Sequence, residues 1–293
     1  MYGKRILLGI TGGIAAYKIA YLIRILMKQE AEVKCIMTPA SSAFISPLVV
    51  STLSENEVSV EFWNKETGSW NNHVRYAEWA DVFLIAPATM NTIGKMANGL
   101  CDNLLLATYF SMKGKTIVAP AMDLDMYKHP SLLRNMDTLT KDGVSIIPAE
   151  NGALASGLEG EGRMLEPNEI IHYVENRIKD TLPLNNLNFL ITAGPTHEKI
   201  DPVRYIGNSS SGKMGYNLAQ KAIELGANVT LIIGPTNLTM DLENINTIRV
   251  EDSQEMYNET IKLFDTSDVV ICSAAILSLI HISEPTRPRL ISY

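Results

Sequence analysis

His73 is the residue whose type and position most directly suggest chemistry. It opens a short segment, 73–81, that leads into the apolar strand 82–85 and a turn of small and hydroxyl residues at 86–92. Ligands of open α/β sheets bind outside the carboxyl ends of the strands, so this imidazole is expected beside a ligand. A near-neutral imidazole can give or take a proton there. From this segment alone, a surface His that flanks a helix is the alternative.

A glycine-rich turn is the second candidate. Residues 9–18 read GITGGIAAYK and join a short apolar strand to a helix. Free backbone N–H groups and the dipole at such a helix N-terminus favour a phosphate. The spacing is not GxGxxG, so a mononucleotide fits better than a dinucleotide, and Thr38 at the end of the next strand is expected beside the same phosphate. A tight turn that needs Gly only for steric reasons is the alternative.

The elements that must position these residues alternate between strands and helices. Strands are expected at 5–10, 32–37, 82–86 and 116–120, and helices at 15–28, 40–53, 92–97 and 103–110. This alternation predicts a parallel sheet covered by helices on both faces, a doubly wound α/β fold. Between 146 and 165 the pattern fails in a polar stretch with several Gly, which predicts a mobile flap, and a helix is expected at 168–179.

A Pro/Asn-rich break at 180–186 predicts a boundary between a first domain, 1–182, and a second domain, 187–275. The second domain is expected to be a partial Rossmann-like α/β unit, with strands at 188–193, 228–233, 247–250 and 268–271 and helices at 214–225 and 253–264. Residues 207–213 satisfy GxxxxGK, but Met214 follows where a P-loop requires Ser or Thr for magnesium. A P-loop NTPase is therefore the weakest interpretation, and an exposed Ser-rich loop is the default one.

Composition limits the function classes. The chain has 293 residues, 46% of them hydrophobic, and a net charge of -7. The negative net charge and the lack of a Lys/Arg block in the sequence argue against nucleic-acid binding. Three cysteines without CxxC pairing indicate neither disulfides nor a zinc site and favour a reducing cytosol, so we expect a cytoplasmic protein with no metal in its first domain. The N-terminus is unlike a signal peptide, and the longest apolar run, 269–282, is too short for a membrane span.

Several of these segments, taken in order, resemble the flavin-dependent phosphopantothenoylcysteine decarboxylase family. They are GITGGIAAYK, HVRYAEWAD, APATMNTIGKMANGLCDNLL, PAMDLDMY and GEGRM, and they cover about the first 180 residues. The segment ITAGPTHEKIDPVRYIGNSSSGKMG is similar to the phosphopantothenate-cysteine ligase that bacteria fuse behind that decarboxylase. The resemblance implies a flavodoxin-like fold, bound FMN, and conversion of 4'-phosphopantothenoylcysteine to 4'-phosphopantetheine in coenzyme A biosynthesis.

The implied reaction explains the need for a flavin. Direct loss of the carboxylate would leave an unstabilised carbanion, so decarboxylation must follow oxidation. In the mechanism that the resemblance implies, oxidation of the thiol-bearing carbon to a thioaldehyde lets carbon dioxide leave, and the enethiolate is then reduced again. The redox chemistry belongs to the cofactor.

The resemblance also implies roles for residues of the first domain. His73 corresponds to the active-site His, Arg163 is a candidate anchor for the substrate phosphate, and Met126 is a candidate substrate contact. Met90 and Met96 are expected only to pack. The residues expected to hold the FMN phosphate are Gly12, Gly13, Ile14, Ala15 and Thr38, and those expected to line its ribityl chain and ring are Ala86, Thr89, Asn91, Thr92 and Lys95.

Two positions depart from the pattern of the relatives. Asp123 stands where many have an Asn that grips the substrate carboxylate, and like charges repel unless one is protonated or paired. Asp123 could instead accept from the substrate amide or be held by a cation. Ser156 stands where relatives have a Cys that is thought to protonate the enethiolate, and Ser is a far weaker acid. Ser156 therefore positions a water, leaves the proton to another donor, or is only a flap residue.

For the second domain the resemblance implies a CTP site with Mg²⁺ that activates 4'-phosphopantothenate for attack by cysteine. The residues expected there are Gly194, Pro195, Asn208, Ser210, Ser211, Gly212 and Lys213, with Arg204 binding the intermediate. The family continues after residue 275 with an Ala-Asp segment and a Lys-rich loop, which the tail 276–293 does not match. We expect this tail to be translated library adapter or a frameshift, and the ligase half to be truncated and inactive; resequencing the locus tests the origin of the tail.

Relatives bind flavin at subunit contacts, so the resemblance implies a homo-oligomer, at least a trimer. The expected ligands are otherwise small molecules, without nucleic acid or membrane. Two alternatives share the fold. One is a non-catalytic, FMN-binding regulatory subunit, against which His73 argues. The other is a flavin prenyltransferase-like enzyme, against which PAMDLDMY, GEGRM and the fused second domain argue.

Overall fold

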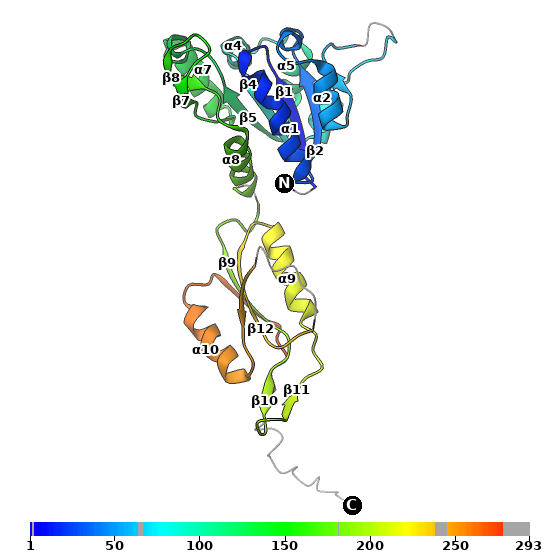
Figure 1. The fold of residues 1–293 in the computed structure, drawn as a ribbon, viewed down its shortest axis with the longest axis vertical. Helices are drawn as coiled ribbons and strands as arrows, with labels where there is room; N and C mark the ends of the chain where they lie inside the picture. Colours follow the sequence, from blue (N-terminus) through cyan, green and yellow to red (C-terminus); the bar gives the residue numbers. More distant parts are fainter. Residues whose placement is uncertain (2, 64–66, 181, 238–244, 278–293) are drawn as a thin grey trace, which may run out of the picture. The chain divides into compact units, whose positions relative to one another are not determined.

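A computed structural model describes residues 1, 3–63, 67–180, 182–237 and 245–277. The chain divides into two compact units, the first formed by Met1–Asn176 and the second beginning at Arg177 (Figure 1). Of the tail for which a foreign origin is predicted, only Ile276 and Leu277 belong to the described residues.

A six-stranded parallel sheet forms the centre of the first unit, in the strand order β3-β2-β1-β4-β5-β6. The central strands are buried along nearly their whole length, as expected when helices cover both faces of a parallel sheet. The strands are β1 (Arg5–Ile10), β2 (Glu32–Met37), β3 (Val58–Ser59), β4 (Val82–Ala88), β5 (Lys115–Pro120) and β6 (Ser145–Ile146).

Helices connect these strands. The expected helix 15–28 is divided into a 3-10 turn and an α-helix, and the expected helix 40–53 is divided in the same way by Ser46 and Pro47. The described helical segments are η1 (Ile14–Lys18), α1 (Ile19–Lys28), η2 (Pro39–Ala43), α2 (Pro47–Ser54), α3 (His73–Trp79), α4 (Met90–Ala97), α5 (Leu104–Ser111), α6 (Leu124–Tyr127), α7 (Pro130–Lys141) and α8 (Pro167–Lys179).

The stretch expected to be a flap contains a two-stranded antiparallel ribbon, β7 (Glu150–Ala153) and β8 (Glu159–Arg163). The ribbon lies beside α6, which follows strand β5. The doubly wound α/β fold predicted from the sequence is thus confirmed, with the flap built as a hairpin.

The core of the first unit is organised around Phe83, which is fully buried in β4. Gly9 in the neighbouring strand β1 leaves the space that this ring occupies: a Cβ at Gly9 would lie 2.9 Å from Phe83 Cε2 and 3.1 Å from Leu105 Cδ1. Strands β1 and β4 are adjacent, so the ring also joins their packing to α5. This tight layer packs the beginning of β4 against β1 and α5.

The second unit has its own four-stranded parallel sheet in the order β13-β12-β9-β14. Its separate core includes Ile191, Ala219 and Leu231. Its elements are β9 (Asn188–Ala193), the ribbon β10 (His197–Lys199) and β11 (Tyr205–Gly207), α9 (Lys213–Glu224), β12 (Asn228–Ile233), β13 (Asn246–Arg249), α10 (Ser253–Phe264) and β14 (Val269–Cys272).

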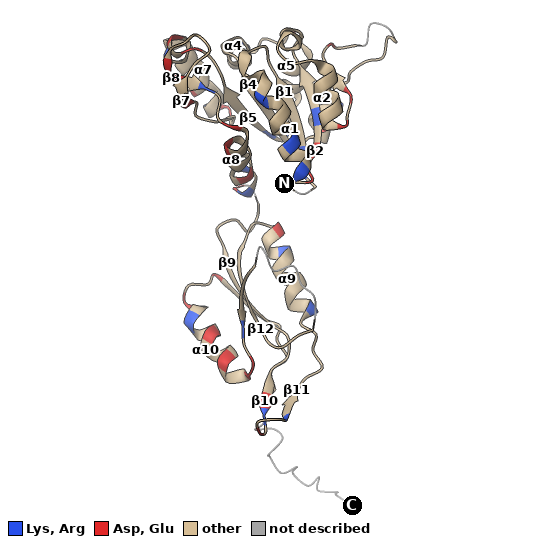
Figure 2. Cartoon of the chain, viewed as in Figure 1, with Lys and Arg blue, Asp and Glu red and all other residues tan. Residues whose placement is uncertain are grey.

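Surface charge is mixed over the described residues. Figure 2 shows Lys and Arg scattered among Asp and Glu on both units, without a continuous basic band. No helix in the described ranges is long and apolar enough to cross a membrane.

The packing of Phe83 makes a testable prediction. Replacing Phe83 by Ala should lower the free energy of unfolding of the first unit by about 3–5 kcal/mol, because a full ring is removed from a close-packed core. Trp63, Trp70 and Trp79 are the tryptophans of the chain and all belong to this unit, so denaturation followed by tryptophan fluorescence measures it. The control is Phe110→Ala, since Phe110 is 46% exposed and should cost about 1 kcal/mol or less. Equal losses would contradict this description of the core.

Candidate active site

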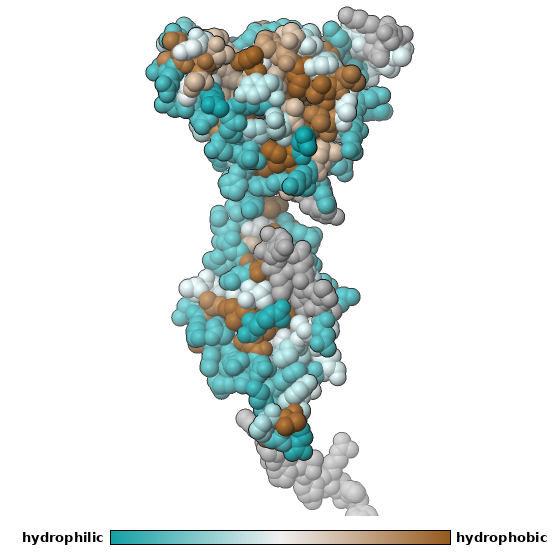
Figure 3. Space-filling view, viewed as in Figure 1, coloured by the Kyte–Doolittle hydropathy of each residue, from teal (hydrophilic) through white to brown (hydrophobic). Residues whose placement is uncertain are grey.

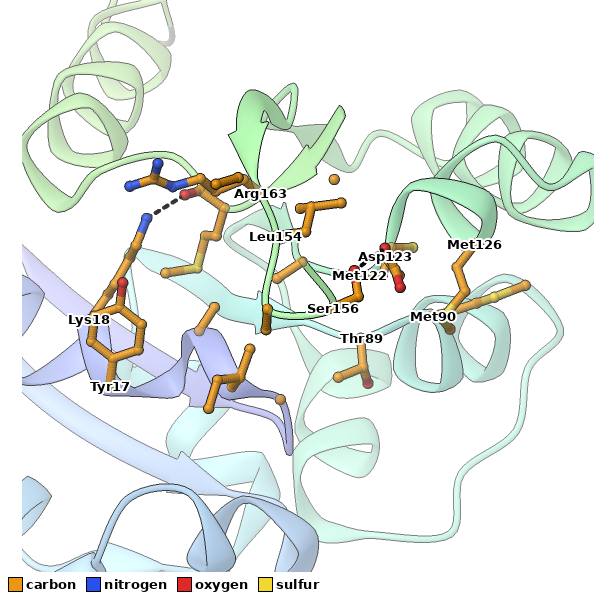
Figure 4. Close-up of a pocket in the computed structure, with 18 residues that line it drawn as sticks. Tyr17, Lys18, Thr89, Met90, Met122, Asp123, Met126, Leu154, Ser156 and Arg163 are labelled. Carbon is orange, nitrogen blue, oxygen red and sulfur yellow. Dashed lines mark hydrogen bonds between the residues drawn. The ribbon is translucent and has the colours of Figure 1, made fainter. Parts of the chain in front are cut away.

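A cavity of about 510 Å³ lies in the first unit, at the carboxyl ends of β1, β4 and β5. The ribbon β7–β8 forms its other side, and the lining is mainly apolar with a few polar groups (Figure 4). The residues that line it are Gly13, Ile14, Ala15, Tyr17, Lys18, Thr89, Met90, Ala121, Met122, Asp123, Met126, Ala153, Leu154, Ala155, Ser156, Gly162, Arg163 and Met164.

Part of the residue set predicted from the sequence meets in this lining. Gly13, Ile14, Ala15 and Thr89 come from the two turns, and Asp123, Met126, Ser156 and Arg163 come from α6 and the ribbon. Met90, expected only to pack, both packs on the core and lines the cavity, whereas Met96 is buried in the core. The predicted cofactor residues outside the lining are Gly12, Thr38, Ala86, Asn91, Thr92 and Lys95.

The turn after β1 is fastened to the turn after β4 by Thr11, which sequence reasoning did not single out. The Thr11 hydroxyl donates to the carbonyl oxygen of Pro87 at 2.6 Å and accepts from the backbone N–H of Thr89 at 3.1 Å. Thr11 is only 1% exposed, so both bonds lie away from water. This one hydroxyl sets the spacing between the glycine turn and the start of α4.

Gly12 has a steric role. A Cβ at this position would lie 2.8 Å from Ala40 Cβ and 2.9 Å from the Ala40 carbonyl carbon, so no larger residue fits between the turn and η2. Gly13 precedes η1 in extended conformation and faces the cavity. The first N–H groups of a helical turn have no acceptor within that turn. In η1 these groups belong to residues at the cavity wall.

The other predicted cofactor residues have contacts within the chain. Thr38 is buried and its hydroxyl donates to the Ile10 carbonyl at 3.4 Å. The Thr92 hydroxyl lies 3.3 Å from the Thr89 hydroxyl, and Ala86 is fully buried in β4. Lys95 forms an ion pair with Asp102 at 2.5 Å, and Asn91 is exposed at the start of α4.

The ribbon is attached to α6 by its backbone and by Ser156. The Met122 N–H donates to the Gly162 carbonyl at 3.0 Å. Gly162 has φ of +140°, and a Cβ there would lie 2.4 Å from Met122 O, so only Gly permits this approach. The Ser156 hydroxyl donates to Asp123 Oδ1 at 3.0 Å (Figure 4). The same Oδ1 accepts from Leu124 N at 2.8 Å.

A buried lysine, Lys18, joins the base of the ribbon to η1. Lys18 is 4% exposed, and its Nζ donates to the Met164 carbonyl at 2.7 Å and to Glu166 Oε1 at 2.9 Å. Arg163 donates to the same Glu166 oxygen at 2.5 Å, and its Nε lies 3.8 Å from a Glu150 carboxylate oxygen. The hydrogen bond from Lys18 is the main cause that lowers the pKa of Glu166. The charges of Lys18 and Arg163 are thus balanced within the wall.

His73 does not line this cavity. It is the first residue of α3, whose N-terminus is capped by Asn72 through bonds of 3.0 and 3.3 Å to Val74 N and Arg75 N. Its ring lies edge-on to Phe62 with centroids 6.5 Å apart. His73 Nδ1 is buried and has no hydrogen-bond partner among the described residues. The imidazole is therefore held in place with one ring nitrogen uncommitted.

The predicted nucleotide residues of the second unit are only partly brought together. Pro195, Asn208, Ser210 and Ser211 line a cavity of about 470 Å³. His197 and Tyr205, which sequence reasoning missed, line it too and stack with ring centroids 3.9 Å apart.

The remaining predicted residues lie outside that lining. Gly194 and Gly212 contact each other, since a Cβ at Gly212 would lie 3.2 Å from Gly194 Cα. Lys213 lies at a separate depression on α9. Arg204 forms an ion pair with Asp201 at 2.6 Å. Within the described residues no group of three or more His, Cys, Asp or Glu side chains could hold a metal ion.

Comparison with known proteins assigns the chain to a family. A family model described as "Flavoprotein" matches residues 1–179, and one described as "DNA/pantothenate metabolism flavoprotein C-terminal domain" matches residues 184–278. The chain belongs to the flavoprotein family. The coenzyme A biosynthesis bifunctional protein CoaBC of Bacillus subtilis (strain 168) is 41% identical over 275 residues, covering 93% of this chain and 68% of that protein.

A relative with another name is more similar over a shorter stretch. A cysteine/cysteine sulfinic acid decarboxylase from an unknown prokaryotic organism is 47% identical over 237 residues, covering 79% of this chain and 66% of that protein. The chain thus spans about two thirds of the length of these relatives.

Solved structures resemble the first unit. A PPC decarboxylase variant complexed with pantothenoylaminoethenethiol has a TM-score of 0.53 at 33% identity and covers 60% of this chain and 99% of its own. The FMN binding protein AtHal3 has a TM-score of 0.52 at 34% identity and covers 61% and 98%. The peptidyl-cysteine decarboxylase EpiD has a TM-score of 0.53 at 29% identity and covers 60% and 100%.

The ion pair of Glu166 makes a prediction about pH. A carboxyl group whose pKa is lowered by folding adds stability above its unfolded pKa and loses that contribution as the pH falls through its folded pKa. On acidification from about pH 5, the melting temperature of the wild type should therefore fall more steeply than that of Glu166→Gln. Tryptophan fluorescence melts across this range measure both. Glu159→Gln is the control, because Glu159 is exposed and pairs with no cation of the described residues. Identical slopes for the wild type and Glu166→Gln would refute the role of the pair.

Proposed function

We propose that this flavoprotein is an FMN-dependent decarboxylase that converts 4'-phosphopantothenoylcysteine to 4'-phosphopantetheine in coenzyme A biosynthesis. The observation that supports this most strongly is the cavity itself, where the glycine turn, Asp123 and the Ser156 ribbon meet. The similarity to CoaBC and to a PPC decarboxylase adds support.

The residues present fit FMN. Gly13 and Ala15 leave room for a phosphate beside the first N–H groups of η1, and Gly12 can carry no side chain without meeting Ala40. Thr89 adds a hydroxyl on the opposite turn, and the apolar lining suits a flat aromatic ring. When bound, FMN would supply the oxidation of the thiol-bearing carbon and its later reduction, which no amino-acid side chain can supply.

The chain's own residues then bind, orient and exclude water. Arg163, held by Glu166, anchors the substrate phosphate. The ribbon that carries Ser156 covers the cavity and excludes water from it. His73 takes the proton of the substrate thiol or orients the carboxylate. Its Nδ1 is buried in its own chain, so this role falls to Nε2.

Because His73 lies outside the cavity of its own chain, we propose that a homo-oligomer, a trimer or larger, completes the site. Exposed apolar side chains support such a contact: Ile14 is 60% exposed in η1, and Leu48 is 74% and Val49 43% exposed in α2. Figure 3 shows apolar surface gathered over α1 and α2. A neighbouring subunit that covers this surface brings its own His73 toward the bound flavin.

The decisive experiment measures carbon dioxide and product mass after 4'-phosphopantothenoylcysteine is added to FMN-loaded protein. The wild type should release carbon dioxide, and His73→Asn should lose about 10²–10⁴-fold in rate while it keeps its yellow colour, because only proton transfer is impaired. His172→Asn is the matched control, since the His172 side chain is 81% exposed on α8. A flavin-loaded wild type that is inert would replace this proposal with that of a non-catalytic binding subunit.

For the second unit we propose a nucleotide site for CTP with Mg²⁺. The loop of Asn208, Ser210 and Ser211 opposite Pro195, with the stacked pair His197 and Tyr205, supports a base and phosphate binding here. The loss of ligase activity stays a sequence-based prediction. Purified protein incubated with CTP, 4'-phosphopantothenate and cysteine should form no amide, and amide detected by mass spectrometry would contradict it.

A further inference from the structure

Asp123 presents one carboxylate oxygen to the cavity without an internal donor. Its Oδ1 accepts from Leu124 N and from the Ser156 hydroxyl. Among the described residues no donor reaches Oδ2, although Asp123 is part of the lining. The carboxylate therefore keeps acceptor capacity directed at a ligand.

The cations of the lining do not fill this capacity. Lys18 and Arg163 both donate to Glu166. Figure 4 shows Lys18 on the opposite side of the cavity from Asp123, whose neighbours include Met122 and Met126. Asp123 is only partly exposed beside these methionines, so a ligand that displaces water from Oδ2 must supply a hydrogen-bond donor in its place.

A carboxylate accepts hydrogen bonds but donates none. When ionised and unpaired it repels the carboxylate of a cysteine unit, because two negative groups in contact destabilise each other. The same unit carries one N–H group next to its carboxylate, either an amide N–H when the amine is acylated or an ammonium when it is free. An amide N–H donates its single hydrogen bond to Oδ2, whereas an ammonium donates one of its three and also offsets the negative charge of the carboxylate.

We propose that Asp123 Oδ2 accepts a hydrogen bond from the nitrogen of the substrate's cysteine unit and so selects substrates with an N–H beside the leaving carboxylate. Ser156 positions this carboxylate by occupying Oδ1 when the ribbon is closed. Asp123 and Ser156 thus act as one recognition device. The inference rests on the proposed function for the identity of the cysteine unit.

The test measures binding of analogues that cannot react. In 4'-phosphopantothenoylserine a hydroxyl replaces the thiol, and in its ester counterpart an oxygen also replaces the N–H group. Isothermal titration of FMN-loaded wild type should give about tenfold or more weaker binding of the ester, the size of one hydrogen bond to a charged acceptor. In Asp123→Ala the two analogues should bind alike. Equal affinities in the wild type, or an unchanged ratio in Asp123→Ala, would overturn the proposal.

Two further variants keep the test independent of folding. Asp123→Ala removes the cap of α6, whereas Ser156→Ala leaves the cap in place and should still shrink the preference for the amide, because Asp123 is no longer oriented. The matched control is Asp125→Ala on the same helix, since Asp125 is exposed and outside the lining; it should keep the wild-type ratio. Loss of the amide preference in Asp125→Ala would count against the proposal.

Turnover then identifies the source of the N–H. A selective loss of carbon dioxide release from L-cysteine in Asp123→Asn assigns the contact to an ammonium, and a selective loss from 4'-phosphopantothenoylcysteine assigns it to an amide. A protein that prefers the amide analogue through Asp123 but releases no carbon dioxide supports this inference and contradicts the proposed decarboxylation, so the two failures are distinguishable.

Discussion

The cavity depends on the buried hydroxyl of Thr11, which joins the chain segments that leave two neighbouring parallel strands. It donates to Pro87 O and accepts from Thr89 N, so both of its hydrogen-bonding roles are used where water does not reach. Strands β1 and β4 are in register through Gly9 and Ile85, and the turns after them emerge side by side. A glycine turn suited to a phosphate and the start of α4 thereby form one wall.

The opposite wall depends on two attachments of the ribbon. Backbone contact between Gly162 and Met122 docks β8 onto the segment before α6, and the buried Lys18 amine ties Met164 to η1. Glu166 accepts from both Lys18 and Arg163 at this base, and Glu150 beside Arg163 supplies the second negative charge. A ligand bound between the ribbon and the sheet is partly shielded from water, so the polar groups of the lining act on it more strongly than they would in water.

Sequence reasoning treated Asp123 and Ser156 as two separate departures from the pattern of relatives. In the structure they are bonded to each other across 33 positions of the chain. The Asp123 carboxylate as acceptor and the Ser156 hydroxyl as donor thus stand where many relatives have an Asn amide and a Cys thiol. The sequence suggested a repulsion between the Asp123 carboxylate and the substrate carboxylate. This repulsion does not arise if another group of the substrate faces Asp123.

The sequence by itself determined the fold class, because the alternation of apolar strands and amphipathic helices is a local pattern. It missed the strands β3 and β6, because two residues are too few to show any periodicity, and it also missed the 12-residue helix α7. Its resemblance to a known family also singled out Gly13, Asp123, Ser156 and Arg163, and all four line the cavity.

Only the tertiary structure decided the roles of Thr11, Lys18 and Glu166, and the place of His73 outside the cavity of its own chain. The physical reason is that these roles arise from contacts between positions far apart, such as Lys18 and Glu166 at a separation of 148 residues. Residue type limits what a side chain can donate or accept, but packing selects its partner.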